Sequence, residues 1–360
     1  TTGKKNFAII QAEDELSAIG MVLGANWNGA RSFTATSGPG ISLMTEFLGF
    51  AFYAEVPAVI FNVQRGGPST GMPTRTQQSD LLSCAYASHG DTKHILLFPE
   101  DPYECFDMAT KAFDLAERIQ TPIIIMSDLE LGMNSWLSAP LSWDDSRSYD
   151  RGKVLSAEDL DKMEHFYRYE DVDGDGMTYR TIPGVHPDKG SYFTRGSSHN
   201  AKGAYSESSQ DYVENMSRLT KKFKNAANLL PAPQMRQEKT DNLFGIIYFG
   251  TTSLVIQEAL DQLEEYGVHL DTLRIRAFPF TDAVYNFINS HLKVYVIEQN
   301  RDGQMRTLLI HEGDIGPSKI ASILHYNGIP MTASFVSESI AADMKLTKNT
   351  DDNQMSEAQS

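Results

Sequence analysis

Residues 56–74 read VPAVIFNVQRGGPSTGMPT. The first part, Val56–Val63, is a short apolar run rich in Val and Ile, which predicts a strand buried on both faces of a sheet. The glycine- and proline-rich residues that follow, Gly66–Gly71, predict a loop. A buried strand that ends in such a loop is typical of a parallel α/β sheet, whose ligands bind at the carboxyl edge of the strands.

The same pattern continues on both sides of this stretch. Segments with helical spacing of apolar residues separate further short apolar runs, and this alternation predicts an α/β domain with helices on both faces of its sheet. We place this domain at residues 1–140. Its predicted strands are Phe7–Gln11, Phe33–Thr36, Val56–Val63, Ile95–Phe98 and Pro122–Ser127, and its predicted helices are Glu15–Trp27, Ile41–Tyr53 and Pro102–Arg118.

The composition changes in the second part of the chain. Residues 141–240 are rich in Asp, Ser, Tyr, Gly and Lys, and we expect a polar insertion and linker with one helix at Asp211–Phe223. Residues 241–346 alternate again and predict a second, smaller α/β domain, while the polar tail 347–360 is expected to be disordered. The strands predicted in this domain are Leu243–Phe249, Leu270–Arg276 and Val294–Gln299, and its helices are Ser253–Tyr266, Thr281–Leu292 and one after Gly303.

Charge and cysteine content exclude several classes of protein. The chain has 31 Lys and Arg against 47 Asp and Glu, a formal net charge of −16, which disfavours nucleic acid and anionic membrane surfaces as partners. No apolar stretch approaches the roughly 18 residues of a membrane-spanning helix. Two cysteines are too few for a disulfide framework or for the about four ligands of an iron–sulfur cluster, and they favour a reducing, cytoplasmic setting.

Two charged residues at predicted strand ends are candidates for chemistry. Arg65 follows the predicted strand Val56–Val63, and its guanidinium fork suits a carboxylate ligand. Glu15 begins the first predicted helix. Each also has a purely structural interpretation, because a surface arginine beside a turn and an acid at a helix N-terminus need no function. The turn Thr36–Gly40 suits either simple helix initiation or the close approach of a ligand, and no catalytic triad order or zinc-ligand spacing is found.

Two further motifs are weaker. Gly66–Gly71 is similar to a phosphate-binding loop, but residues 72–73 read Met-Pro where such a loop continues with Lys and Ser or Thr, which excludes a nucleotide loop. Asp171–Gly176 opens like a calcium-binding loop, yet its twelfth position is Ile182 instead of Glu. With Asn200 it also resembles the diphosphate–magnesium motif of thiamine enzymes, but no buried strand precedes it. We favour an acidic turn and keep a calcium-binding module as the alternative.

Six strings spread over essentially the whole chain resemble the α subunit of the 2-oxoacid:ferredoxin oxidoreductases, particularly the 2-oxoglutarate type. They are QAEDE at 11–15, TATSGPG at 34–40, QRGGPSTGMPT at 64–74, RTIPG at 180–184, GSYFTRG at 190–196 and VIEQN at 296–300. The resemblance implies a thiamine diphosphate-binding fold. Its pyrimidine-binding α/β domain is N-terminally incomplete, and a small α/β domain like the C-terminal domain of transketolase follows it.

The resemblance also implies roles for individual residues. Glu15 matches the glutamate that hydrogen-bonds the aminopyrimidine ring of thiamine diphosphate, and Ser37 and Gly38 are implied to bind the cofactor. Arg65 matches the arginine that holds the substrate carboxylate, and Thr70 is a second substrate-binding candidate. The implied reaction is the oxidative decarboxylation of a 2-oxoacid with coenzyme A to acyl-CoA and CO₂. We favour 2-oxoglutarate, and pyruvate or branched-chain 2-oxoacids remain open.

The implied partners supply what this chain lacks. A β subunit would carry the diphosphate–Mg²⁺ site and a [4Fe–4S] cluster, and ferredoxin would take up the electrons; a non-catalytic structural subunit of such a complex is the alternative. The family's pyrimidine domain begins with a Tyr-Pro-Ile-Thr-Pro motif upstream of the matched strings, for which this chain has no room. We therefore expect a truncated or proteolysed α chain, or one whose missing N-terminal segment or γ domain is a separate chain.

Overall fold

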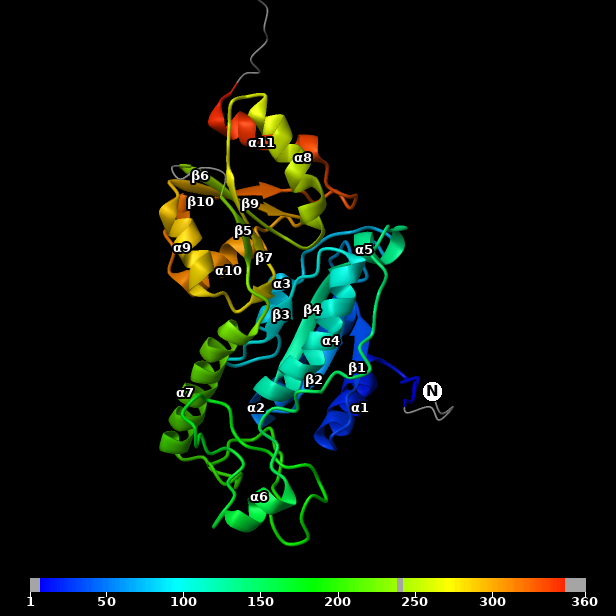
Figure 1. Cartoon of the computed structure of the whole chain (residues 1–360), viewed down its shortest axis with the longest axis vertical. Helices are drawn as coiled ribbons and strands as arrows, with labels where there is room; N and C mark the ends of the chain where they lie inside the picture. The colour runs from blue at the N-terminus through cyan, green and yellow to red at the C-terminus, as the bar shows by residue number, and fades with distance from the viewer. Residues whose placement is uncertain (1–6, 238–241, 347–360) are drawn as a thin grey trace, which may run out of the picture.

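The computed structural model describes residues 7–237 and 242–346. They form two five-stranded sheets, with strand orders β1-β2-β4-β3-β8 and β10-β9-β6-β7-β5. Figure 1 shows the first sheet in the middle of the molecule, between the second sheet and a lobe that carries the helices α6 and α7. The α/β architecture expected from the alternation of apolar runs and helices is confirmed.

The first sheet is parallel through its first four strands, β1 (Phe33–Thr36), β2 (Ala58–Gln64), β4 (Pro122–Asp128) and β3 (Ile95–Leu97). Both of its faces are buried, which explains why its strands are apolar throughout. One face packs against α1 (Glu15–Trp27) and α2 (Gly38–Ala54), and the other packs against α4 (Pro102–Ile119). The short helices α3 (Leu81–Ala85) and α5 (Leu129–Met133) follow the carboxyl ends of β2 and β4.

Local sequence accounts for where these helices begin and end. Asp101 caps α4 by accepting a hydrogen bond from the backbone N–H of Glu104, and Pro102 occupies the first turn, where its missing N–H costs nothing. Helix α2 also has a proline in its first turn. It ends at Glu55, whose left-handed backbone (φ 57°) stops the helix.

The second sheet is also parallel, except for its edge strand β5. Helices α8 and α11 cover one face, and α9 and α10 cover the other. Its strands are β5 (Gln234–Arg236), β6 (Phe244–Phe249), β7 (Asp271–Ile275), β9 (Lys293–Glu298) and β10 (Ile320–Leu324). Its helices are η2 (Gly250–Thr252), α8 (Ser253–Glu264), α9 (Asp282–Ser290), α10 (Gln304–Gly313), η3 (Pro317–Lys319) and α11 (Ala333–Met344).

The two sheets share one hydrophobic core. The short strand β8 (Ala277–Phe278) leaves the second half of the chain and pairs antiparallel with β3 of the first sheet. The cluster of buried side chains around it contains residues of both halves, such as Ile60, Ile124, Ile247 and Met305. This shared core fixes the carboxyl edges of the two sheets relative to each other.

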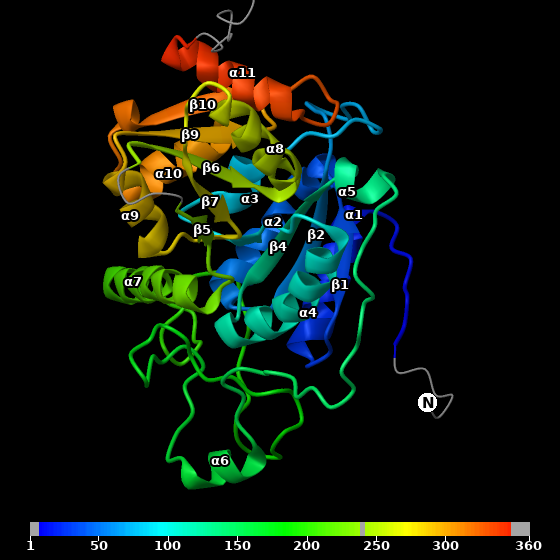
Figure 2. The ribbon, with the colours of Figure 1, turned by 45° about the horizontal axis from the view of Figure 1, so that its top comes forward.

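Among the described residues of the insertion and linker, the regular elements besides β5 are α6 (Ala157–Lys162), α7 (Ser209–Ala226) and η1 (Ala227–Leu229). In both views its α6 part projects away from the second sheet (Figures 1 and 2). Helix α7 is attached through buried charges, because Arg218 and Lys222 both bind the fully buried carboxylate of Glu55, with Nζ of Lys222 2.7 Å from Oε2. No helix within the two described ranges is both long and apolar enough to cross a bilayer.

Several expectations were wrong. Phe7–Gln11 is no strand: Phe7 is 67% and Ile9 is 90% exposed, and within the described residues the segment pairs with no strand. An apolar run becomes a strand only where a neighbour supplies ladder hydrogen bonds and cover. The expected linker contains the edge strand β5, while β8, β10 and α11 were not predicted. The expected disorder at 347–360 lies outside the described residues, and the domain boundaries remain a prediction.

Candidate functional site

Three of the predicted site residues line one cavity. Gly38, Arg65 and Thr70 surround a space of about 790 Å³ together with residues of the second sheet. Gly38 follows β1 and Arg65 follows β2, so both lie at the carboxyl edge of the first sheet. The second sheet contributes Asn300, Arg301, Asp302, Gln304 and Tyr326 from the segments after β9 and β10. The cavity therefore lies where the carboxyl edges of both sheets meet.

Arg65 is available for a ligand. It follows Gln64, the last residue of β2, and its side chain is partly buried. Its Nε atom is buried without a hydrogen-bond partner, and the described residues offer its guanidinium no ion pair within 4 Å. A buried guanidinium nitrogen without a partner carries the cost of its lost hydration. A carboxylate bound in this cavity would remove that cost and would match the two-pronged geometry of the side chain.

Asp80 is the acidic residue that sequence reasoning missed. Its carboxylate oxygens lie 2.9 Å from the position a β-carbon on Gly38 would occupy, so a larger residue there would require the Asp80 carboxylate to shift. Burial raises the pKa of the Asp80 carboxyl, although the hydrogen bond from Asn62 (3.0 Å) and the charge of Arg65 oppose this. In the sequence Asp80 looks only like an acid at the start of an apolar helical run, and no local signal links it to Arg65.

Glu15 and Ser37 lie beside this cavity and are not among its lining residues. Glu15 is the first residue of α1, and its Cγ atom lies 2.8 Å from the β-carbon position of Gly40. The neighbouring Asp14 caps the helix by accepting a hydrogen bond from the backbone N–H of Ser17 (2.7 Å). Asp14 is therefore the capping residue of α1, and Glu15 faces the first turn of α2. Ser37 is the N-cap of α2, but its side chain makes no capping hydrogen bond.

The glycine-rich loop is folded back on itself. The N–H of Met72 donates to the carbonyl of Gly66 (2.6 Å), and the N–H of Gly66 donates to the carbonyl of Arg75 (2.8 Å). At Gly71 the backbone is left-handed (φ 64°), and a β-carbon there would lie 1.8 Å from the Gly66 carbonyl oxygen. This tight loop leaves Thr70 exposed at the margin of the cavity.

The aspartates of the acidic turn Asp171–Gly176 have partners within the protein. Nζ of Lys153 lies 2.7 Å from Asp173 and 2.8 Å from Asp175, and Asp171 accepts a hydrogen bond from the N–H of Gly176. Within residues 7–237 and 242–346, no group of three His, Cys, Asp or Glu residues is arranged to hold a metal ion. These contacts support the interpretation as an acidic turn.

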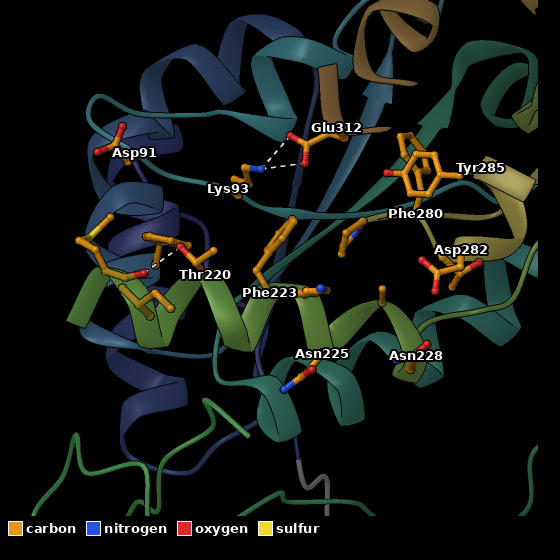
Figure 3. A pocket seen from close by; sticks show the side chains of 17 residues that line it. Asp91, Lys93, Thr220, Phe223, Asn225, Asn228, Phe280, Asp282, Tyr285 and Glu312 are labelled. Carbon is orange, nitrogen blue, oxygen red and sulfur yellow. Dashed lines mark hydrogen bonds and ion pairs between the residues drawn. The ribbon is translucent and has the colours of Figure 1, made fainter. Parts of the chain in front are cut away.

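A second cavity, of about 470 Å³, contains none of the predicted site residues. It lies along α7, with Phe223 below the Lys93–Glu312 ion pair and Tyr285 to the right of that pair (Figure 3). Glu312 is held by both oxygens to Nζ of Lys93, at 2.7 and 2.8 Å, and also accepts a hydrogen bond from Tyr86. Lys93 and Glu312 are thus bound to each other, in contrast to Arg65.

Comparisons with known proteins agree with this geometry. Residues 1–185 match the family model described as pyruvate flavodoxin/ferredoxin oxidoreductase, thiamine diphosphate-binding. The chain is 37% identical over 329 residues to the 2-oxoacid:ferredoxin oxidoreductase 2 subunit alpha of Aeropyrum pernix, covering 90% of this chain and 50% of that protein. It is 30% identical over 296 residues to the 2-oxoglutarate synthase subunit KorA of Methanocaldococcus jannaschii, covering 81% and 75%.

Solved structures show the same relationship. The 2-oxoglutarate:ferredoxin oxidoreductase of Magnetococcus marinus, solved with 2-oxoglutarate, coenzyme A and succinyl-CoA, superposes with a TM-score of 0.84 at 30% identity, covering 93% of this chain and 57% of that one. A split-gene transketolase matches at 12% identity with a TM-score of 0.51, which concerns the fold alone. The chain spans about half the length of the first curated relatives it matches. The chain belongs to the pyruvate flavodoxin/ferredoxin oxidoreductase family and carries its thiamine diphosphate-binding domain.

Proposed function

We propose that this chain acts as the α subunit of a thiamine diphosphate-dependent 2-oxoacid:ferredoxin oxidoreductase, with 2-oxoglutarate as the first candidate substrate. The proposed reaction is oxidative decarboxylation with coenzyme A to acyl-CoA and CO₂ in the cytoplasm. The names of the relatives and the ligands bound in the Magnetococcus marinus structure support this proposal. The observation that carries it is the partly buried Arg65, whose buried Nε atom lacks a hydrogen-bond partner in a cavity between two sheet edges.

The residues around Arg65 suit a 2-oxoacid. The guanidinium would bind the substrate carboxylate in a charge-assisted pair, and this would orient the keto carbon within the cavity. Thr70 would contribute a hydroxyl from the margin. Asp80 lies in the same cavity, and burial raises the pKa of its carboxyl against the hydrogen bond from Asn62 and the charge of Arg65.

The turn before α2 suits the thiamine ring. Gly40 has no room for a side chain because Glu15 and Thr36 occupy that space, so the Glu15 carboxylate is held beside the start of α2. We assign to Glu15 the task of holding a proton at the aminopyrimidine nitrogen. Ser37, whose hydroxyl is not used as a cap, and Gly38 would face the cofactor. When bound, thiamine diphosphate supplies the nucleophilic carbon and the electron sink for decarboxylation.

In this proposal, partner proteins supply the groups of the reaction that this chain does not carry. The whole chain contains two cysteines, fewer than the about four thiolates of a [4Fe–4S] cluster. We therefore place the cluster and the diphosphate–Mg²⁺ site on a β subunit, from which electrons would pass to ferredoxin. In this proposal, the regions of the relatives that this chain does not span include a γ domain. These regions would belong either to the same polypeptide or to a separate one.

The test uses the assembled complex and an acceptor-reduction assay with coenzyme A. The 2-oxoacids to compare are 2-oxoglutarate, pyruvate and a branched-chain 2-oxoacid. We expect Arg65→Ala to lower kcat/KM for the best substrate by about 10- to 100-fold, the value of a charged hydrogen bond, and Arg65→Lys to lower it less. Arg118→Ala, at an exposed ion pair with Asp150, is the matched control.

Two results would contradict the proposal. An unchanged kcat/KM in Arg65→Ala would remove the role of this side chain in substrate binding. A fully assembled wild-type complex without activity on any 2-oxoacid would favour a structural subunit.

A further inference from the structure

Four hydrogen bonds join the two halves of the chain along one wall of the cavity. The N–H of Gln78 donates to the carbonyl of Gln299 (2.8 Å), and Nδ2 of Asn300 donates to the carbonyl of Gln78 (3.1 Å). The side-chain amide of Gln304 makes the other two, donating from Nε2 to the carbonyl of Ser79 (2.6 Å) and accepting from the N–H of Leu82 (3.1 Å). We call these contacts between residues 78–82 and 299–304 the interdomain clamp.

The side chains of Gln78, Gln299, Asn300 and Gln304 are buried, and Ser79 and Leu82 are partly buried, which limits the access of water to the hydrogen bonds between them. Gln78, Gln299 and Asn300 are each at most 2% exposed, and Gln304 is 9% exposed. A buried backbone group that loses its partner carries the full cost of its desolvation. The amide of Gln304 suits this position because a single side chain satisfies one carbonyl and one N–H of the segment that precedes and begins α3.

A second layer of polar side chains forms hydrogen bonds with the side chains of Gln78 and Gln299. Nε2 of Gln78 donates to Oδ2 of Asp128 (2.7 Å) at the end of β4 and to the hydroxyl of Thr251 (3.0 Å) in η2. Nε2 of Gln299 donates to the same hydroxyl (3.0 Å). A β-carbon on Gly250 would lie 2.7 Å from Nε2 of Gln78, which leaves this layer little freedom to shift.

The clamp reaches the proposed substrate site through Asp80. Ser79 and Asp80 line the cavity from the first half of the chain, and Asn300 and Gln304 line it from the second. Asp80 lies between Ser79 and the start of α3, and its carboxylate rests against Gly38 and accepts from Asn62. A change in the distance between residues 78–82 and α10 therefore moves the acid that shares the cavity with Arg65.

We propose that Gln304, supported by Asn300, is a positioning residue that holds residues 78–82 against α10 and thereby sets the place of Asp80 in the substrate cavity. The inference rests on the proposed function for its catalytic consequence. It assigns Gln304 no contact with reacting atoms. The effect passes through the backbone of Ser79 and Leu82, to which both ends of the amide are bound.

The experiment replaces Gln304 in the assembled complex and measures two quantities. Gln304→Leu keeps the size and removes both hydrogen bonds, while Gln304→Glu keeps an acceptor for Leu82 and loses the donor to Ser79; it is also the second variant if the first does not assemble. Gln210→Leu, on the exposed side of α7, is the control. The measurements are hydrogen exchange of residues 78–82 without substrate and kcat/KM for 2-oxoglutarate and pyruvate.

We expect both variants to speed exchange in residues 78–82 at least tenfold and to lower kcat/KM by tenfold or more, in the same proportion for both substrates. A common factor follows because the amide acts on the cavity wall and does not touch the side chain of the substrate. Unchanged exchange would overturn the clamp, and unchanged kcat/KM with faster exchange would overturn its effect on the site. A loss confined to one substrate would assign Gln304 a direct contact and overturn positioning.

The two proposals fail in different ways. A wild-type complex that assembles but reduces no acceptor with any 2-oxoacid contradicts the proposed function. Faster exchange in the variants of such a complex still supports the clamp, and unchanged exchange overturns it.

Discussion

Cγ of Glu15 lies 2.8 Å from the place where a β-carbon on Gly40 would be, and Oγ1 of Thr36 lies 1.8 Å from the same point. Three elements thus meet at a residue without a side chain: the start of α1, the end of β1 and the first turn of α2. The absence of a β-carbon at residue 40 allows the Glu15 carboxylate to lie beside the turn that leads into the cavity. Glycine at this position serves close packing, because its backbone is ordinary helix.

This relationship predicts the effect of adding one methyl group. Gly40→Ala should push Thr36 and Glu15 away from each other and lower acceptor reduction by the complex at least tenfold. Gly24→Ala is the matched control, because a β-carbon there meets nothing within 4 Å and alanine favours the helix α1 by about 1 kcal/mol. Full activity in Gly40→Ala would show that the contact with Glu15 has no catalytic importance.

Removing the negative charge of Glu15 should lower the activity of the complex more than displacing the Glu15 side chain does. We expect Glu15→Gln to lower kcat of the assembled complex by about 100-fold or more, since the proton at the cofactor ring loses its acceptor, with subunit assembly unchanged. Asp14→Asn, at the helix cap, is the control and should leave both stability and turnover nearly unchanged, because asparagine caps a helix about as well as aspartate. Steady-state kinetics together with size-exclusion chromatography measures both quantities, and near-normal turnover in Glu15→Gln would exclude the assignment.

The attachment of α7 depends on the buried carboxylate of Glu55. The Arg218 and Lys222 cations around it hold the pKa of Glu55 well below its usual range, despite complete burial. Glu55→Gln leaves these two cations without their counter-ion, so the free energy of unfolding should fall by about 3–5 kcal/mol. Urea denaturation measures this change, with Glu46→Gln at an exposed helix position as the control. A loss below about 1 kcal/mol would contradict the importance of the cluster.

Glu130 should make stability depend on pH. Burial and the neighbouring Asp128 raise the pKa of Glu130 to about 7, against the hydrogen bond with Thr251. The unfolded chain ionises this group near its ordinary pKa, so its contribution to stability is present in acid and is lost as the pH rises to about 7.

Glu130→Gln should therefore match the wild type at pH 4 and exceed its stability above pH 7, by about 1 kcal/mol after allowance for the partial exposure of the group. Thermal unfolding between pH 4 and 8 measures the difference. The exposed Glu164→Gln is the control and should show no such trend. A stability difference that is constant over this range would contradict the raised pKa.

The site residues that were predicted and those that were missed differ in how they are placed in the site. Arg65 was predicted because it follows a short apolar run, and the carboxyl ends of parallel strands meet at one edge, whereas Gly38 was predicted from the family resemblance. Asp80 and Gln304 were missed because nothing near them in the sequence distinguishes them from ordinary helix-terminal residues. Gln304 enters the site through a contact with Leu82, more than 200 positions away, and Asp80 enters it through contacts with Asn62 and Gly38 on neighbouring elements of the first half.

Sequence alone determined the local elements of this protein, because the period of apolar residues and the turn residues act over a few positions. It predicted β1, β2 and β4 and the bounds of α1, and it predicted an arginine at the carboxyl end of β2. Only the tertiary structure decided that Phe7–Gln11 stays exposed and that β8 crosses to the first sheet. Pairing and cavity formation depend on which distant segments meet, and the shared core and the interdomain clamp decide that.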